Sequence, residues 1–240
     1  MPTLLSIVQG FCGRTNISVP TSVIGSTDPQ IVQVQRLLEE EGVDLATRAD
    51  WQELTQQGTF VSVASEEQGL IATIADDGYR SIKNETFWDR SSSLPVLGPL
   101  SAKEWQTLKA VANTGPRYWY RIRGGQLLMN PAPAAGLNFF FEYVSKNWIL
   151  SNDGTTTQAR FANDADDVLL DYDLLTMGLR WRWKKEKGFE YAEDFRTYET
   201  QVDKAMARDG GKPTLQMGDS GRWKVRPGIF VPVGSWNVTP

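Results

Sequence analysis

Residues 163–208 read NDADDVLLDYDLLTMGLRWRWKKEKGFEYAEDFRTYETQVDKAMAR, and their pattern decides the fold. Apolar side chains recur in two series, which are Leu170, Leu174, Met177 and Trp181, then Tyr191, Phe195, Tyr198, Val202 and Ala205. Within each series the steps are three or four residues, and such steps keep side chains on one face of an α-helix. The stretch therefore predicts two amphipathic helices.

The break between these two helices is expected at Gly188, because glycine readily takes the left-handed conformation that ends a helix. The charges agree with a break there. The lysines that precede it are Lys184, Lys185 and Lys187, and the acids that follow it are Glu190, Glu193 and Asp194. Cations at a helix C-terminus and anions at a helix N-terminus both complement the helix dipole. The sequence predicts an αα-hairpin.

Two further helices are expected near the start of the chain. Residues 3–13 form a short amphipathic pattern. A second helix begins after Asp28, a good N-cap, with Pro29 at its first position. Gly42 is expected to end this helix, with one more turn over residues 44–49.

Residues 51–150 have the period of two that is typical of strands. We expect a β-hairpin from residues 51–56 and 59–64, with Gln57 and Gly58 at its turn. A second hairpin joins residues 117–123 to 126–129 through Gly124 and Gly125, which permit the positive φ angles of a tight turn. Residues 137–144 form another strand, and Ser101 with Glu104 predicts a capped short helix.

These elements predict an α+β protein. A helical bundle is formed by both ends of the chain (residues 1–50 and 160–208), and an antiparallel β-domain (residues 51–150) is inserted between them. Residues 209–240 are expected to form an extended C-terminal arm, whose apolar residues include Trp223, Phe230 and Trp236. An extended arm cannot bury these side chains by itself. It lies either across the protein's own surface or on a partner, by strand addition.

The amino-acid composition excludes several classes of catalytic and metal site. The chain has 240 residues, a net charge of −4 and a pI near 5.1, which argues against wrapping nucleic acid over its whole surface. It has no histidine, which excludes Ser-His-Asp catalysis and the common histidine-based zinc and iron sites. Its single cysteine, Cys12, excludes an internal disulfide and is interpreted as a small core residue. We expect no catalytic residues, no metal and no cofactor.

The chain carries no pattern that would direct it to a membrane. Its start, MPTLLSIVQGFCGR, lacks the basic segment and long apolar run of a signal peptide. No stretch approaches the roughly 18 to 20 apolar residues of a membrane helix. We expect a soluble protein that is made in a cytoplasm.

Three clusters have both a functional and a structural interpretation. The acidic run of Asp164, Asp166, Asp167, Asp171 and Asp173 lacks the spacing of a calcium loop, so an acidic helix N-terminus is favoured. The basic run of Arg180, Arg182, Lys184, Lys185 and Lys187, interleaved with Trp181 and Trp183, is typical of phosphate contact, of a helix C-terminus or of an inter-subunit salt-bridge face. The latter two are favoured because the protein is acidic overall.

The third cluster is RYWYRIR at residues 117–123. It is compatible with a carbohydrate or nucleic-acid platform, but strand alternation places Tyr118, Tyr120 and Ile122 on one face, which favours core packing. Paired carboxylates for glycoside hydrolysis stay open as a distant alternative, because distances in space are not visible in a sequence.

Three phrases carry a resemblance to a known family. They are RYWYRIRGGQLLMNPAP (117–133), FFFEYVSKNW (139–148) and LRWRWKKEKGFEYAEDFRTYE (179–199). Each is similar to a part of the head-to-tail adaptor (connector) proteins of tailed bacteriophages, the tail tubular protein A-like family: a strand pair, the strand that closes the β-domain, and two C-terminal helices. The likeness covers roughly residues 1–208.

This resemblance implies a virion structural protein at the head–tail junction, made in the host bacterial cytoplasm and without catalytic activity. The expected assembly is a homo-oligomeric ring, usually a dodecamer, that joins the portal protein to the tail tube or nozzle protein. Double-stranded DNA would pass through its channel without sequence recognition, and no membrane would be involved. An alternative from another class is a carbohydrate-binding module of a phage tail component, built on the β-domain.

Within such a ring we expect the αα-hairpin and the C-terminal arm to contact a neighbouring subunit or the portal. The residues expected at that interface are Arg180, Arg182, Lys184, Lys185, Glu190, Asp194, Trp223, Phe230 and Trp236.

Overall fold

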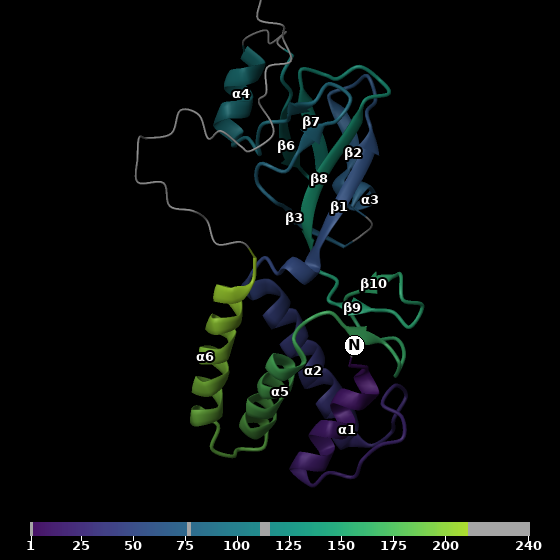
Figure 1. Cartoon of the computed structure of the whole chain (residues 1–240), viewed down its shortest axis with the longest axis vertical. Helices are drawn as coiled ribbons and strands as arrows, with labels where there is room; N and C mark the ends of the chain where they lie inside the picture. The colour runs from purple at the N-terminus through teal and green to yellow at the C-terminus, as the bar shows by residue number, and fades with distance from the viewer. Residues whose placement is uncertain (1, 76–77, 111–115, 211–240) are drawn as a thin grey trace, which may run out of the picture. The chain divides into compact units, whose positions relative to one another are not determined.

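A computed structural model describes residues 2–75, 78–110 and 116–210 of the chain (Figure 1). Residues Met1–Asp209 form one compact unit, and residues 210–240 form a second unit. The helices are α1 (Leu4–Thr15), α2 (Pro29–Arg48), α3 (Ile71–Ile74), α4 (Ala102–Ala110), α5 (Tyr172–Glu186) and α6 (Ala192–Arg208), with a 3₁₀ turn at Gln52–Leu54. Helices combine with antiparallel sheets, which confirms the α+β class.

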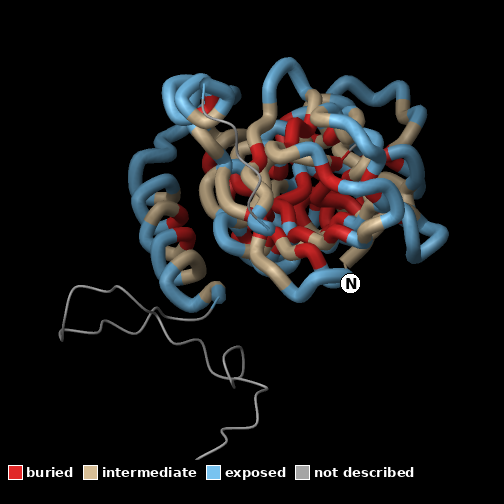
Figure 2. The backbone as a smooth tube through the Cα atoms, turned by 90° about the horizontal axis from the view of Figure 1, so that it is seen from above, coloured by how far each residue is buried: buried red, intermediate tan, exposed pale blue. Residues whose placement is uncertain are grey.

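Four of the helices share one hydrophobic core. Helix α2 packs against α5, α5 packs against α6, and α1 contacts both α2 and α5. These helices lie side by side in Figure 1, and Figure 2 shows buried residues gathered in the interior of the chain with exposed residues around them. This helical core also receives Val144 from the central strand of the main sheet and Trp148 from the segment that follows that strand. Side chains from the strand-rich part of the chain therefore pack directly against the helices.

Eleven strands are present in the described part of the chain: β1 (Thr55–Val61), β2 (Glu67–Leu70), β3 (Tyr79–Ile82), β4 (Trp88–Asp89), β5 (Leu94–Pro95), β6 (Trp119–Arg123), β7 (Gln126–Asn130), β8 (Asn138–Ser145), β9 (Ile149–Leu150), β10 (Thr157–Gln158) and β11 (Asp167–Val168). Strand β8 organises the largest sheet and pairs antiparallel with β1, β3 and β4. A second sheet has the order β2-β7-β6, and a small third sheet has the order β10-β9-β11. All of the named strand pairs in the described residues are antiparallel, and an isolated parallel bridge joins Leu97 to Trp119.

The first two sheets enclose a second core, which is rich in aromatic rings. Phe87 is at its centre, with ring centroids 4.9 Å from Tyr120, 5.5 Å from Phe141 and 5.9 Å from Phe139. Two of these pairs are tilted and the third is edge-on, so all of them avoid the unfavourable face-to-face arrangement. Although the chain has two cores, residues 1–209 form a single compact unit. The division into a 1–50 plus 160–208 bundle and a 51–150 insert thus stays a prediction.

Several local expectations are confirmed. The side chain of Asp28 caps α2 at Gln30, with Pro29 at the first helical position. The backbone N–H of Ser101 donates to Glu104, and the backbone N–H of Glu104 donates to the Ser101 hydroxyl, which is the predicted capping box of α4. The β6–β7 hairpin turns at Gly124 and Gly125, with φ angles of 57° and 77°. The strand predicted at 137–144 is β8, and Cys12 is buried in the helical core.

The hairpin predicted around Gln57 and Gly58 is wrong. Strand β1 runs straight through both residues, and Gly58 pairs with Phe141 on β8. A β-carbon at Gly58 would lie 2.5 Å from Cζ of the Phe141 ring. This glycine is therefore needed to make room for an aromatic ring, and it does not form a turn.

The end of α2 predicted at Gly42 is also wrong, because the helix continues to Arg48. Gly42 is buried, and a β-carbon there would lie 2.2 Å from the Trp148 side chain. The close approach of Trp148 explains the glycine, and no cap is present at this position.

The acidic helix N-terminus expected at residues 164–173 is only partly present. Helix α5 begins at Tyr172, and Asp171 is its N-cap, accepting from the backbone N–H groups of Asp173 and Leu174. Leu170, Asp164, Asp166 and Asp167 all precede the helix. The carboxylates of Asp164 and Asp166 accept backbone N–H groups of neighbouring loops, and these bonds hold the segment in a non-helical conformation.

Candidate subunit interface

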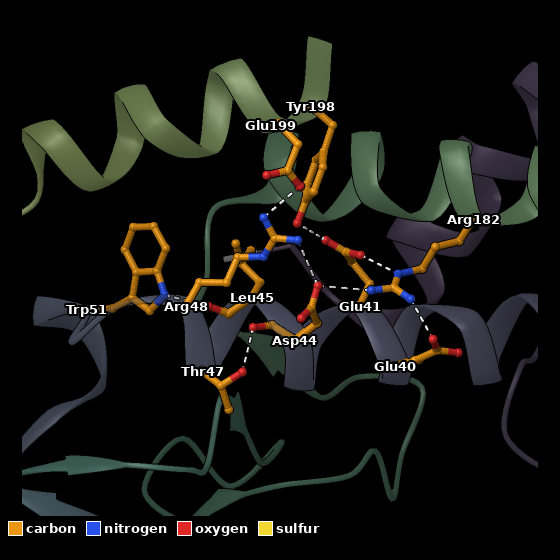
Figure 3. Close-up of polar contacts among 10 residues, drawn as sticks. All are labelled: Glu40, Glu41, Asp44, Leu45, Thr47, Arg48, Trp51, Arg182, Tyr198 and Glu199. Atoms are coloured by element: carbon orange, nitrogen blue, oxygen red, sulfur yellow. Dashed lines mark hydrogen bonds and ion pairs between the residues drawn. The ribbon is translucent and has the colours of Figure 1, made fainter. Parts of the chain in front are cut away.

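The αα-hairpin carries most of the side chains that were expected at an interface, and Arg182 is the least accessible of them. Its side chain is 12% exposed. The guanidinium reaches three carboxylates of α2: Nε lies 2.5 Å from Glu41, one terminal nitrogen lies 3.0 Å from Asp44, and the other contacts Glu40 (Figure 3). Arg182 therefore joins α5 to α2 within the chain.

Glu41 is the most buried member of this group, with no exposed surface. Gly178 on α5 faces it, and the absence of a β-carbon at residue 178 is what lets the carboxylate lie between the helices. One carboxylate oxygen accepts from Arg182, and the other accepts from the hydroxyl of Tyr198 on α6. Three helices thus meet at a single buried carboxylate.

Burial raises the pKa of Glu41, and the hydrogen bonds from Arg182 and Tyr198 oppose that rise. Burial also raises the pKa of Tyr198, and the adjacent Glu41 carboxylate raises it further. Tyr198 consequently keeps its proton and remains the donor. The arrangement satisfies a buried charge with two donors, as such a charge requires.

Arg48 adds the second connection between α2 and α6. One of its nitrogens lies 2.7 Å from Glu199 of α6, and another lies 3.1 Å from Asp44 of its own helix. Its guanidinium carbon is 5.3 Å from the centroid of the Tyr198 ring, within the range of a cation–π contact. We call Glu40, Glu41, Asp44, Arg48, Arg182, Tyr198 and Glu199 the polar network.

The end of α2 beyond this network is held by two side chains from the strand-rich part of the chain. The Trp51 indole donates to the carbonyl of Leu45 at 2.7 Å. Arg80, on β3, donates to the carbonyl of Ala46 at 2.6 Å and forms an ion pair with Asp50 at 3.2 Å. Both contacts satisfy groups at a helix C-terminus, where carbonyls lack partners within the helix.

The remaining charged residues of the hairpin lie closer to its turn. Arg180 and Lys184 on α5 both form ion pairs with Asp194 on α6, the first at 3.0 Å. Arg180 is nevertheless 59% exposed. Lys185 lies 5.9 Å from the Trp181 ring, and Glu190 accepts from the backbone N–H of Ala192. These residues line the two sides of the hairpin near Gly188.

The turn itself exposes large apolar side chains. Phe189 is 57% exposed, and Tyr191 and Phe195 are each 37% exposed. Phe195 contacts the Trp181 ring edge-on at 5.0 Å, and Phe189 lies 5.9 Å from the Trp183 ring. We call Phe189, Tyr191 and Phe195 the turn patch. Clustered exposed aromatic side chains of this kind are typical of surfaces that contact another protein.

One comparison with known proteins bears on this surface. The SU10 adaptor protein family matches residues 14–226, which include the hairpin, the polar network and the aromatic core, but not most of α1. The chain belongs to the SU10 adaptor protein family. This assignment agrees with the coarser part of the resemblance, a structural adaptor of bacteriophages that is incorporated in the virion with other virion proteins. No curated protein matches the chain.

The family assignment adds no catalytic role, and the chemistry of this adaptor is compatible with a structural one. No cluster of acidic or cysteine side chains suited to a metal ion occurs within residues 2–75, 78–110 and 116–210. No helix in the same part of the chain is long and apolar enough to cross a membrane.

The role of Asp166 was not predicted from the sequence, in which it is one member of the acidic run. It is fully buried and accepts from the backbone N–H groups of Asn152, Ala162 and Asn163 and from the Gln158 amide. Burial alone would raise its pKa, but these hydrogen bonds outweigh burial and lower it. The acidic run therefore contains a structural carboxylate that organises a loop.

The strand RYWYRIR places its tyrosines as core packing requires. Tyr120 is buried, and the Tyr118 ring packs edge-on against Phe139 at 5.8 Å. Tyr120 and, in part, Tyr118 therefore pack in the second core, as the core-packing interpretation expects.

The interface assignments made from sequence stay predictions. The structure brings Arg180, Lys184 and Asp194 together, whereas Arg182 belongs to the polar network. Trp223, Phe230 and Trp236, and the arm that carries them, lie outside the described residues. The polar network itself had a signal in the sequence: Val34, Leu38, Glu41 and Leu45 are spaced by four, three and four residues, so that Glu41 falls on the buried stripe of α2.

Proposed function

We propose that this adaptor forms a homo-oligomeric ring, a dodecamer as the resemblance implies, between the portal protein and the tail tube or nozzle protein. The family match over residues 14–226 is the observation that carries this proposal, because it covers most of the chain. The tail tubular protein A-like group is the proposed relationship within the phage adaptors. Double-stranded DNA passes through the channel of the ring.

The αα-hairpin is the proposed contact between subunits. A ring requires a heterologous interface, in which two different surfaces of each subunit meet. The turn patch supplies exposed aromatic area, and aromatic side chains dominate the energetics of interfaces. Arg180, Lys184, Lys185, Glu190 and Asp194 surround the patch and supply the polar rim.

The charge of the chain supports passage of DNA without retention. Duplex DNA carries one negative charge per about 1.7 Å of its axis, and each phosphate that a protein neutralises adds to its affinity. A chain with a net charge of −4 lacks the excess of cations that would hold the duplex tightly. We therefore propose that DNA contacts are weak and independent of base sequence.

The proposal is tested by measuring the mass of the purified chain, alone and mixed with the portal protein, by native mass spectrometry and sedimentation. The expected result is a closed oligomer alone, or one that forms on the portal. A chain that stays monomeric under both conditions contradicts the ring.

The interface within the ring is tested with Phe189→Glu, which places a charge in the turn patch. We expect this variant to remain folded and to lose oligomer formation. Val19→Glu is the matched control, because Val19 is 56% exposed but belongs to another surface loop. Loss of assembly in both variants, or in neither, removes the turn patch from the interface.

A further inference from the structure

Helix α6 is anchored to the rest of the chain by little apolar surface. It has 17 residues, of which only Tyr198 and Val202 are buried. Helix α1, with 12 residues, buries five. Apolar burial is the main source of local stability, and segments with little of it open before the rest of a protein does.

Helix α6 is joined to α2 by a small set of polar contacts. Within the described residues, α5 is the only helix with which α6 shares an extensive surface. The polar part of the connection to α2 consists of the Tyr198 hydroxyl on Glu41 and of Arg48 on Glu199, with the Arg48 guanidinium over the Tyr198 ring. We call this set the latch. Polar contacts exchange readily with water, because the net gain from each is small compared with its strength in isolation.

The segment between the two helices can act as a hinge. Helix α5 ends at Glu186 and α6 begins at Ala192, and all the residues from 187 to 191 are exposed. Gly188 has a φ of 74°, in the left-handed region where glycine has no steric cost. Hinges are short segments at the ends of elements that absorb a change of backbone angle.

The surface of α5 that α6 covers also contains a buried hydrogen-bond donor without an acceptor. The indole nitrogen of Trp181 on α5 is buried and has no hydrogen-bond acceptor within the described residues. A buried donor without an acceptor loses its bonds to water and gains none in exchange. Opening of α6 would return the Trp181 indole, which contacts Phe195 and Tyr198, to solvent or to another acceptor.

From these observations we infer that α6 is a hinged helix, which opens as a unit about residues 187–191 and is held closed by the latch. Opening exposes the apolar face of α5 centred on Trp181. This device is a property of the single chain, so exchange is measured on the monomer, because a neighbouring subunit on the hairpin would also slow exchange in α6.

Hydrogen–deuterium exchange of the full chain, followed by mass spectrometry of its peptides, tests the hinge. We expect the amides of α6 to exchange as a group and sooner than those of α2 and α5. Tyr198→Phe removes only the hydroxyl that bonds to Glu41, and it should increase exchange in α6 about 10- to 150-fold, as expected for loss of one hydrogen bond to a charged group. Exchange in α1 and α2 should not change.

Tyr191→Phe is the matched control, because it removes a hydroxyl from the start of the same helix that makes no hydrogen bond within the described residues. Glu199→Gln weakens the latch at its other contact and should also increase exchange in α6 alone. The inference is overturned if α6 exchanges as slowly as α2 and α5. It is equally overturned if Tyr198→Phe accelerates exchange in all four helices together, since α6 would then open only when the whole chain unfolds.

Discussion

The carboxylate of Glu41 occupies the space that a side chain on Gly178 would require. A β-carbon at residue 178 would lie 2.1 Å from both Cδ and Oε1 of Glu41. The buried charge, its donors Arg182 and Tyr198, and the packing of α2 on α5 all depend on this close approach. A glycine in the middle of a helix costs about 1 kcal/mol relative to alanine, so its presence here is explained by packing and not by helix propensity.

The first prediction follows from that relationship. Gly178→Ala should destabilise the protein, because the new methyl group displaces the Glu41 carboxylate from its donors. Overpacking of this kind typically costs about 1–3 kcal/mol. Urea unfolding monitored by circular dichroism measures the change in the free energy of unfolding.

Gly13→Ala on α1 is the control, because nothing lies within 4 Å of a β-carbon at that position. Better helix propensity should leave this variant equal to or slightly more stable than the parent protein. A Gly178→Ala variant that is also as stable as the parent would show that Glu41 can move without loss.

The second prediction concerns Arg182. Arg182→Ala leaves the buried carboxylate of Glu41 with one donor fewer, and breaking a buried ion pair typically costs about 3–5 kcal/mol. The hydrogen bond from Arg182 opposes the raised pKa of Glu41, so its loss raises that pKa further. When folding raises the pKa of a carboxyl group, the folded protein loses stability as the pH increases through that pKa. The Arg182→Ala variant should therefore lose more stability at neutral pH than in acid.

The matched control is Arg36→Ala, because the ion pair of Arg36 with Glu39 lies on the surface of the same α2. Exposed pairs contribute about 0–1 kcal/mol. Thermal unfolding of the two variants between pH 4 and pH 8 checks the difference. Equal losses in both, or a loss in Arg182→Ala that is independent of pH, would contradict the importance of the buried pair.

The sequence predicts those elements whose signals are local. Asp28 with Pro29, Ser101 with Glu104, and the two glycines of the β6–β7 turn each act within four residues, and all were located correctly. Gly42 and Gly58 were misinterpreted because a glycine that makes a turn and one that makes room look alike in a sequence. The difference lies in Trp148 and Phe141, each more than eighty residues away along the chain.

The polar network was also hard to predict, because its residues are far apart along the chain. The position of Glu41 on the buried stripe of α2 is visible in the sequence, but its partners are not. Arg182 is 141 residues away and Tyr198 is 157 residues away, and several other arginines and tyrosines would have served equally well on pattern alone. Arg182 was consequently expected on an outer face, together with Arg180 and Lys184.

The third prediction concerns Asp166, the buried carboxylate of the loop before α5. Asp166→Ala removes the acceptor of three backbone N–H groups and should cost about 2–3 kcal/mol at neutral pH. The pKa of Asp166 is below its ordinary value of 3.8, so this contribution is present above pH 3.8 and is lost as the pH falls through the lowered pKa. The difference in stability from the parent protein should therefore shrink in acid.

Urea unfolding at pH 7 and at pH 3 measures that difference. Asp203→Ala is the control, because Asp203 lies on the exposed side of α6 and makes no hydrogen bond or ion pair within the described residues. A difference between Asp166→Ala and the parent that grows in acid would have the wrong sign for a carboxyl with a lowered pKa.

The fourth prediction concerns Arg80, which connects β3 to the end of α2. The pairing of β3 with β8 shifts register between Tyr79 and Ser81, so Arg80 lies in an irregularity of the β-bulge kind. A bulge can redirect a side chain out of the normal alternation, and here the guanidinium donates to the carbonyl of Ala46 at 2.6 Å and pairs with Asp50. A cation at a helix C-terminus also complements the helix dipole.

Arg80→Ala should therefore cost about 1–3 kcal/mol, the usual effect of leaving partly buried acceptors without their donor. Hydrogen exchange should increase in the last turn of α2 and in β3, and less in α1. Arg121→Ala is the matched control, since Arg121 is a partly exposed strand arginine without a hydrogen bond or ion pair in the described part of the chain. If both variants are equally stable, then Trp51 and the shared core hold the end of α2 without Arg80, and the bulge has another cause.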